Sequence, residues 1–359
     1  MNHQALHIHI GTKNIGVGYP VYLVAELSAN HGNKLEHALQ LIYAAKESGA
    51  DAIKLQTYRA DTLTFDGNQP CFKIYGGTPW DGKTLHALYQ EAAIPWEWYP
   101  RLAKEANALG LSIFSSPFDT TAVDFLETQE TPAYKIASFE LVDFPLIRKV
   151  AKTGKPMILS TGMATLGEIE EAVNAARAAG ARELLLLKCT SAYPAPVEDM
   201  NLRTIPHLSK TFDVPVGLSD HTLETTTPVA AVAMGACLIE KHLTLSRNDG
   251  GPDASFSLEP AEFAAMAKAV RQTEQALGTV RYSLTPSETN NRTFRRSLFV
   301  VQNMCAGDVF TTENVRSIRP SHGLHTRYLE QILGCQTTCN VPKGTPLEWS
   351  FIRSKDTRT

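Results

Sequence analysis

Several features that would direct the interpretation elsewhere are missing from this sequence. No apolar stretch reaches the length that a membrane-spanning helix needs. The N-terminal segment MNHQALHIHIGTKNIG lacks a basic start followed by an apolar run, so we expect no secretory signal. The formal net charge is only −3, so neither nucleic acid nor an anionic membrane is expected as the main partner. We therefore expect a cytoplasmic protein whose partners are small molecules.

Cysteine is scarce and scattered. No two of the six cysteines have the spacing of a zinc knuckle. Cys189 and Cys237 lie in apolar runs, where a thiol behaves as a small core residue. Cys335 and Cys339 are close enough in sequence to bridge, but a reducing cytoplasm favours free thiols.

Short apolar runs alternate with segments of helical period between Tyr22 and His242. Leu35, Ala38 and Ile42 lie on one apolar stripe of a helix. Runs that are apolar throughout are typical of parallel strands covered on both faces. The sequence therefore predicts an α/β fold, a (β/α)8 TIM barrel. The alternative, a doubly wound sheet, would carry a glycine-rich turn where this chain has ELSANHG. The expected strands are VYLVAEL (21–27), DAIKLQ (51–56), LSIFSS (111–116), AYKIAS (133–138), PMILST (156–161), ELLLLKC (183–189), VPVGLS (214–219) and CLIEKH (237–242).

The pattern changes after the barrel. We expect the barrel domain over 1–280, with a short N-terminal β-hairpin at 6–19 and a closing helix near 261–277. A polar linker follows at 281–293. Residues 294–354 have short β-like runs and should form a small, mostly β module, too small to carry a large active site alone.

Polar residues follow every expected strand. A serine or threonine in such a place is more often a helix cap or turn residue than a ligand. The set is more informative, because the active site of such a barrel forms at the C-terminal ends of its strands. Lys54 and Lys135 would place positive charge there, which suits phosphate or carboxylate. The set comprises Glu26, Asn30, His31, Lys54, Gln56, Ser115, Ser116, Lys135, Ser138, Ser160, Thr161, Thr190, Ser191, Tyr193, Ser219, Asp220, His221, Glu240 and His242.

His221 and His242 follow two neighbouring expected strands. Adjacent strands lie about 5 Å apart, so both imidazoles can reach one ion. Two imidazoles with waters, and a carboxylate such as Glu26 nearby, suit a borderline divalent ion such as Mn²⁺. The alternative is that both histidines form hydrogen bonds within the rim without a metal. Spacing alone leaves both readings open.

Nine motifs in order resemble those of the sialic acid synthase family: AELSANHG, DAIKLQTY, FSSPFD, YKIAS, STGM, KCTSAYP, GLSDHT, IEKH and GGPD. This resemblance implies a barrel followed by an antifreeze-protein-like (SAF) domain. It also implies a transferase that condenses phosphoenolpyruvate with an N-acylated amino sugar, metal-dependent and with C–O bond cleavage.

One segment resembles the pseudaminic acid synthase branch of that family, FKIYGGTPWDGKTLHALYQEAAIPWEWYP. The implied sugar is 2,4-diacetamido-2,4,6-trideoxy-β-L-altropyranose, and the implied pathway leads to flagellin glycosylation. N-acetylneuraminic or legionaminic acid synthesis from an N-acetylmannosamine-type sugar remains the alternative. The divergence of 71–91 from sialic acid synthases fits a different hexose.

The resemblance also implies roles for single residues. Glu26 would act near the reacting carbons, and His221 and His242 would hold the metal, Mn²⁺ or else Mg²⁺ or Co²⁺. Ser191 stands where bacterial sialic acid synthases often have Asn. A domain-swapped homodimer is implied, in which Arg319 reaches the partner's sugar. The implied phosphoenolpyruvate contacts are Lys54, Ser116, Lys135, Ser138, Ser160, Ser191 and Ser219, and the implied sugar contacts are Gln56, Tyr193, Glu240, Asp253 and Arg319.

Two other classes of function stay open at this stage. One is a metal-dependent barrel aldolase or hydrolase that uses no phosphoenolpyruvate. The other is a non-catalytic sugar-binding protein. Sugar binding alone relies on aromatic platforms and neutral hydrogen-bonding groups, so the rim lysines argue against it.

Overall fold

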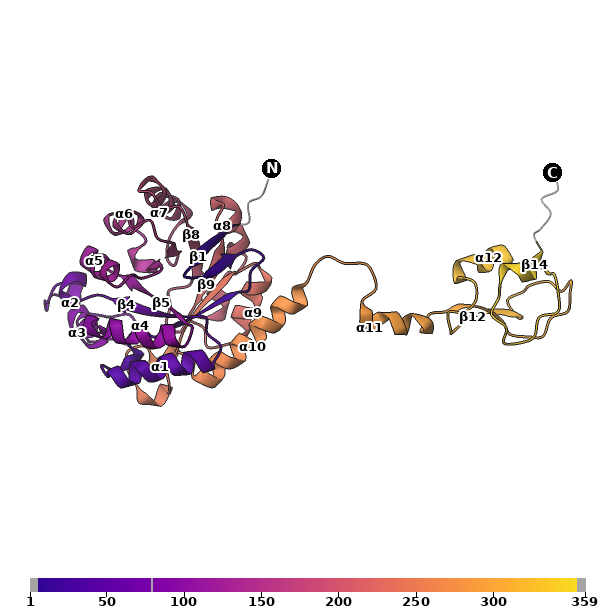
Figure 1. Ribbon diagram of the computed structural model, residues 1–359, viewed down its shortest axis with the longest axis horizontal. Coiled ribbons are helices and arrows are strands. Elements are labelled where there is room, and N and C mark those ends of the chain that lie inside the picture. The colour runs from indigo at the N-terminus through magenta and orange to yellow at the C-terminus, as the bar shows by residue number, and fades with distance from the viewer. Residues whose placement is uncertain (1–5, 79, 354–359) are drawn as a thin grey trace. The chain divides into compact units, whose positions relative to one another are not determined.

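The structure, a computed structural model, describes residues 6–78 and 80–353 (Figure 1). The chain divides into two compact units after Gly278, and each is described by itself. The domain limits expected from the sequence, at 280 and 294, stay predictions.

A closed barrel of eight parallel strands forms the first unit, in the order β10-β3-β4-β5-β6-β7-β8-β9. This confirms the predicted (β/α)8 barrel. Every one of the eight strands lies within or overlaps a run that the sequence marks as apolar. The strands are β3 (Tyr22–Glu26), β4 (Ala52–Thr57), β5 (Ser112–Pro117), β6 (Tyr134–Ile136), β7 (Met157–Ser160), β8 (Leu184–Cys189), β9 (Val216–Asp220) and β10 (Leu238–His242).

Helices surround the barrel (Figure 1). The apolar stripe of α1 buries Ala38 and Ile42 against the strands. Thr165 and Glu168 form a capping box that fixes the start of α7. The helices are α1 (Leu35–Glu47), α2 (Ala60–Leu63), α3 (Leu85–Ala92), α4 (Tyr99–Ala108), α5 (Thr120–Thr128), α6 (Phe144–Ala151), α7 (Leu166–Ala178), α8 (Thr204–Phe212), α9 (Thr226–Ala233) and α10 (Pro260–Leu277).

The inside of the barrel is apolar toward the N-terminal ends of the strands. Val24, Ala52 and Phe114 share one buried cluster with Ile8 and Ile10. These isoleucines belong to an antiparallel hairpin of β1 (His7–Ile10) and β2 (Lys13–Gly16), which closes this end. Side chains alternate along a strand, so the inward residues two positions further on reach the C-terminal end. Those positions carry Glu26, Lys54, Ser116, Lys135, Ser160, Cys189 and Glu240.

The second unit is small and rich in β structure. Its core gathers Leu298, Val300, Phe310, Val315 and Ile332. Its elements are α11 (Pro286–Thr289), β11 (Ser297–Val300), β12 (Val315–Ile318), α12 (Leu329–Ile332), β13 (Gln336–Thr337) and β14 (Ile352–Arg353).

Among the described residues, no helix is long and apolar enough to cross a membrane. The cytoplasmic location expected from the sequence stays a prediction. All six cysteines are free thiols, so Cys335 and Cys339 form no bridge.

Candidate active site

Four charged side chains lie together at the C-terminal end of the barrel interior. Lys54 Nζ lies 2.5 Å from Glu26 Oε2 and 3.5 Å from Glu240 Oε1. Lys135 Nζ lies 3.2 Å from the same Glu240 oxygen. All four side chains are buried. Because two positive groups meet two negative groups, the cluster can exist out of water.

The cluster shifts the ionisation of its members. Burial opposes the charge of Glu240, but Lys135 and Lys54 outweigh that effect and lower its pKa to about 2. Burial raises the pKa of Glu26, and the Lys54 charge offsets only part of that rise. Burial lowers the pKa of Lys135, against the attraction of Glu240. The carboxylate of Glu240 is thus the anion that both lysines share.

Serine hydroxyls stand beside the lysines. Ser219 Oγ donates to Glu240 Oε1 at 3.1 Å, and Lys54 Nζ donates to Ser116 Oγ at 3.4 Å. Among the described residues, the buried Ser160 Oγ has no hydrogen-bond partner. The hydroxyls and ammonium groups together offer an anion several donors.

Ser138 and Ser191 approach each other over Gly162. The Gly162 amide donates to Ser138 Oγ at 3.1 Å. A Cβ at this position would lie 2.2 Å from Ser191 Oγ and 2.7 Å from Ser138 Oγ. Glycine is therefore required here, because any side chain would push the two hydroxyls apart.

The two histidines are neighbours, with ring centroids 5.4 Å apart. His221 Nδ1 lies 3.0 Å from the Thr190 carbonyl oxygen, and His242 Nδ1 lies 3.1 Å from Ser28 Oγ. These contacts hold the rings and leave Nε2 as the nitrogen that is suited to a metal. Burial and the charge of His221 lower the pKa of His242 well below its ordinary value, so His242 is neutral, as a ligand must be. Burial opposes the charge of His221, but Cys189 outweighs it and raises the pKa of His221, so His221 would release a proton on binding an ion.

The donor set fits an open metal site. Within the described ranges, no three His, Cys, Asp or Glu side chains are arranged to hold an ion. Glu26, the carboxylate that the sequence suggested nearby, is bound instead to Lys54 and to the Ser28 amide at 2.9 Å. Two imidazoles held through Nδ1 suit an ion whose other ligands are water or substrate.

Aromatic rings stand beside the histidines. Tyr193 lies 4.4 Å from His221 between ring centroids, and Phe256 lies 5.0 Å from His242. Asp253, another expected sugar contact, accepts a hydrogen bond from the Ala29 amide at 3.3 Å. Gln56 is paired in register with Ser116, on the same rim. Arg319, the last expected sugar contact, belongs to the second unit.

Asp220 does not join the inner cluster. Its carboxylate lies 2.6 Å from Lys241 Nζ. Strand alternation turns Asp220 and Lys241 away from the barrel interior, while Ser219, Glu240 and His242 face inward. The rim set expected from the sequence therefore contains residues with two different roles.

Sequence reasoning missed several residues of this end of the barrel. Cys189 is buried as expected, but its Sγ lies 3.6 Å from Ser191 Oγ, among the inward polar side chains at the C-terminal ends of the strands. Burial opposes the thiolate of Cys189, but His221 outweighs it and lowers the pKa of Cys189 to about 6. Burial raises the pKa of Glu140 to about 7. The spacing of Leu185, Leu187 and Cys189 was the signal that could have placed the thiol inward.

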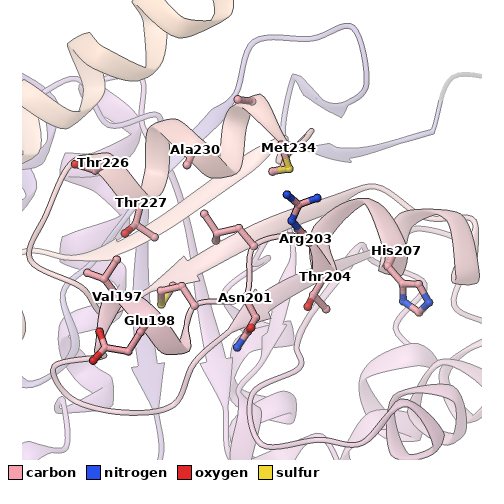
Figure 2. A pocket seen from close by; sticks show the side chains of 13 residues that line it. Val197, Glu198, Asn201, Arg203, Thr204, His207, Thr226, Thr227, Ala230 and Met234 are labelled. Atoms are coloured by element: carbon pink, nitrogen blue, oxygen red, sulfur yellow. The ribbon is translucent and has the colours of Figure 1, made fainter.

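A groove lies elsewhere on the barrel, between α9 and the segment that leads into α8 (Figure 2). Val197, Arg203, Thr227 and Met234 are among the residues that line it. None of the four charged residues of the inner cluster is among them. The chemistry of the strand ends is therefore separate from this groove.

Comparison with known proteins places the chain in a family. The NeuB family model matches residues 41–282, and the SAF domain model matches residues 295–353. A pseudaminic acid synthase of Campylobacter jejuni is 44% identical over 95% of this chain and 99% of its own length. An N,N'-diacetyllegionaminic acid synthase of Legionella pneumophila is 34% identical over 96% of this chain and 98% of its own.

A solved structure supports the same assignment. N-acetylneuraminic acid synthetase from Leptospira borgpetersenii aligns with a TM-score of 0.72 and 30% identity, over 81% of this chain and 96% of that chain. The chain belongs to the NeuB family and carries a C-terminal SAF domain.

Proposed function

We propose that the protein acts as a pseudaminic acid synthase. It condenses phosphoenolpyruvate with 2,4-diacetamido-2,4,6-trideoxy-β-L-altropyranose and releases pseudaminic acid and phosphate. The observation that carries this proposal is a pair of buried lysines among serine hydroxyls, next to two adjacent histidines on one rim. The greater identity to the Campylobacter pseudaminic acid synthase than to the Legionella enzyme favours this hexose. We further propose that the product serves flagellin glycosylation.

Lys54 and Lys135 bind phosphoenolpyruvate by neutralising its carboxylate and phosphate. Lys135 and Ser219 now donate to one oxygen of Glu240, and Lys54 forms an ion pair with the same oxygen. The other oxygen, Oε2, is buried and has no hydrogen-bond partner among the described residues. When the substrate takes these donors, Glu240 becomes free to accept hydrogen bonds from the sugar. One carboxylate thus holds the donors in place before phosphoenolpyruvate arrives.

His221 and His242 would hold a divalent ion through Nε2, with water or substrate as its other ligands, and the ion that we propose is Mn²⁺. When bound, the ion supplies Lewis acidity to the aldehyde oxygen of the open-chain sugar. Ser28 and the Thr190 carbonyl keep both rings oriented for that task.

The remaining chemistry concerns phosphoenolpyruvate and one water. C3 of phosphoenolpyruvate forms a bond with the aldehyde carbon, water adds at C2, and the C2–O bond to phosphate breaks. Glu26 takes the proton of that water. Its raised pKa makes it a better base than an ordinary carboxylate, and Lys54 holds it in place.

We also propose a domain-swapped homodimer, in which the C-terminal domain of one chain covers the barrel mouth of the other. Large apolar side chains are exposed in the loops after β6 and β7, where Phe139 is 59% and Met163 62% exposed. Such a rim favours burial against another surface. Arg319 would then reach the partner's site.

Mixing two inactive variants tests the swap. His221→Ala and Arg319→Ala homodimers should each lack activity. Random exchange would give half mixed dimers, each with one intact site, so about a quarter of wild-type activity should return. If both site residues act within one chain, mixing restores nothing and the swapped arrangement is wrong.

A substrate panel analysed by mass spectrometry tests the function itself. Phosphate release should require both phosphoenolpyruvate and the trideoxy sugar. Phosphoenolpyruvate labelled at its bridging oxygen should deliver the label to phosphate. Turnover of phosphoenolpyruvate with N-acetylmannosamine, and not with the trideoxy sugar, would indicate the sialic acid reaction instead. Sugar turnover without phosphoenolpyruvate would indicate an aldolase or hydrolase, and sugar binding without turnover a binding protein.

A further inference from the structure

The segment between α2 and α3 brings a tryptophan to the site. Trp80 Nε1 donates to the Pro252 carbonyl oxygen at 2.8 Å, in the GGPD segment that follows β10. Its ring lies 5.7 Å from Tyr193 and 6.4 Å from Phe256, measured between ring centroids. Three aromatic rings therefore meet beside the two histidines.

The segment that carries Trp80 is tied in place by its own hydrogen bonds. The Asp81 carboxylate accepts from the amides of Gly77 and Thr78 at 2.9 Å each. Ile74 and Lys83 are joined by a backbone hydrogen bond of 3.0 Å, and Lys73 bridges to Thr84. These contacts fix the backbone near the tryptophan, so the indole is held in one position beside the site.

The rings are ordered outward from the histidines. Tyr193 and Phe256 contact the imidazoles, and Trp80 contacts Tyr193 and Phe256 from further out. In the proposed reaction the sugar's aldehyde end lies at the histidines, and a carbon chain that runs outward along Tyr193 and Phe256 brings its opposite end to Trp80. That end is C6, which is a methyl group in the trideoxy sugar.

We infer that Trp80, with Tyr193 and Phe256, forms an apolar wall that selects a 6-deoxy sugar over its 6-hydroxy counterpart. This inference rests on the proposed function. The indole N–H already bonds Pro252 and the Tyr193 hydroxyl bonds Ser191, so the wall offers methyl contact through its carbon atoms. A C6 hydroxyl against such a wall would lose its water hydrogen bonds without replacement.

The test compares kcat/KM for the trideoxy sugar and for the same sugar with a C6 hydroxyl. Wild type should prefer the trideoxy sugar. Trp80→Ala should reduce that preference at least about tenfold, mainly through KM, with the KM for phosphoenolpyruvate unchanged. Trp80→Phe should keep most of the preference, and Asp81→Asn should reduce it less than Trp80→Ala. Tyr43→Ala, which removes an exposed aromatic ring from helix α1, is the control and should change neither kcat/KM.

The outcomes separate two kinds of failure. If wild type does not turn over the trideoxy sugar, the proposed function and this inference both fall. If wild type turns over the trideoxy sugar but Trp80→Ala lowers kcat/KM equally for both sugars, or for neither, the inference alone is wrong. A thermal unfolding midpoint close to wild type assures that Trp80→Ala compares folded enzymes.

Discussion

Two buried ion clusters share strands β9 and β10 but face opposite ways. On the outward side, Lys241 bonds Asp220 at 2.6 Å and also donates to the Thr222 carbonyl oxygen. On the inward side, Lys54 and Lys135 share Glu240, whose second oxygen has no hydrogen-bond partner among the described residues. The outward pair is satisfied by protein alone. The inward cluster keeps unused bonding capacity, as a site for a ligand must.

The largest expected effect is on activity and comes from the inward side. Lys135→Met should lower kcat/KM for phosphoenolpyruvate about a thousandfold, because a charge that neutralises the substrate is lost. Unfolding free energy should fall by less than about 2 kcal/mol, since Lys54 and Ser219 still bond Glu240. Steady-state kinetics and urea unfolding measure both. The exposed Lys149→Met is the control, and a loss of activity below tenfold would contradict the assignment.

The outward pair should show the reverse behaviour. Lys241→Met leaves the buried Asp220 without its cation and should lower the unfolding free energy by about 3–5 kcal/mol. kcat/KM of the folded fraction should stay close to wild type. Adding Asp220→Asn should recover part of the stability, because the uncompensated charge is then removed. Unchanged stability in Lys241→Met would mean that the pair is not structural.

Glu140 extends the comparison to a carboxyl near the inner lysines that forms no ion pair with any described residue. Burial raises its pKa from 4.5 to about 7. Below pH 4.5 the carboxyl is protonated in both states. Between pH 4.5 and 7 the unfolded chain releases the proton first, so the folded state loses stability as pH rises.

Glu140→Gln should therefore match wild type at pH 4 and exceed it at pH 8 by at most about 3 kcal/mol. Urea unfolding at both pH values checks this. The exposed Glu170→Gln should show no such difference. Equal stability of Glu140→Gln and wild type at pH 8 would show that the pKa of the Glu140 carboxyl is not raised.

The smallest expected effect concerns Glu240 as the anion that occupies the lysines. Glu240→Gln removes the competing charge, so phosphoenolpyruvate should bind about fivefold more tightly, a change of about 1 kcal/mol. The KM for the sugar should rise, because the carboxylate that accepts from it is gone. Calorimetry of phosphoenolpyruvate binding checks the first effect. Weaker binding in this variant would show that Glu240 supports the substrate and does not compete with it.

The sequence was enough to predict the barrel and the rim where polar residues gather. Wholly apolar strands and helical spacing follow from burial on both faces, which any parallel barrel requires. The direction of single side chains was less accessible. The sequence predicts Asp220 on the inner rim, but strand alternation turns its side chain outward. It predicts Cys189 as a core residue because Leu184 to Leu187 precede it, but the thiol contacts Ser191.

The local pattern does not place other residues in space. Trp80 lies in a segment outside the barrel's strands and surrounding helices, so its place depends on the distant Pro252 carbonyl. Phe256 likewise gains meaning only from its contact with His242 across the fold. Contacts between segments far apart in the sequence cannot be read from periodicity, which reports only a residue's own element.

The N-terminal hairpin closes one end of the barrel interior. Ile8, Ile10 and Ile15 pack there against inward apolar residues of the strands, so in the proposed reaction both substrates would enter from the C-terminal ends of the strands. Phosphoenolpyruvate held by Lys54 and Lys135 would then lie deeper in the barrel than the sugar, which would block its release. The proposed function therefore implies ordered binding, with phosphoenolpyruvate before the sugar.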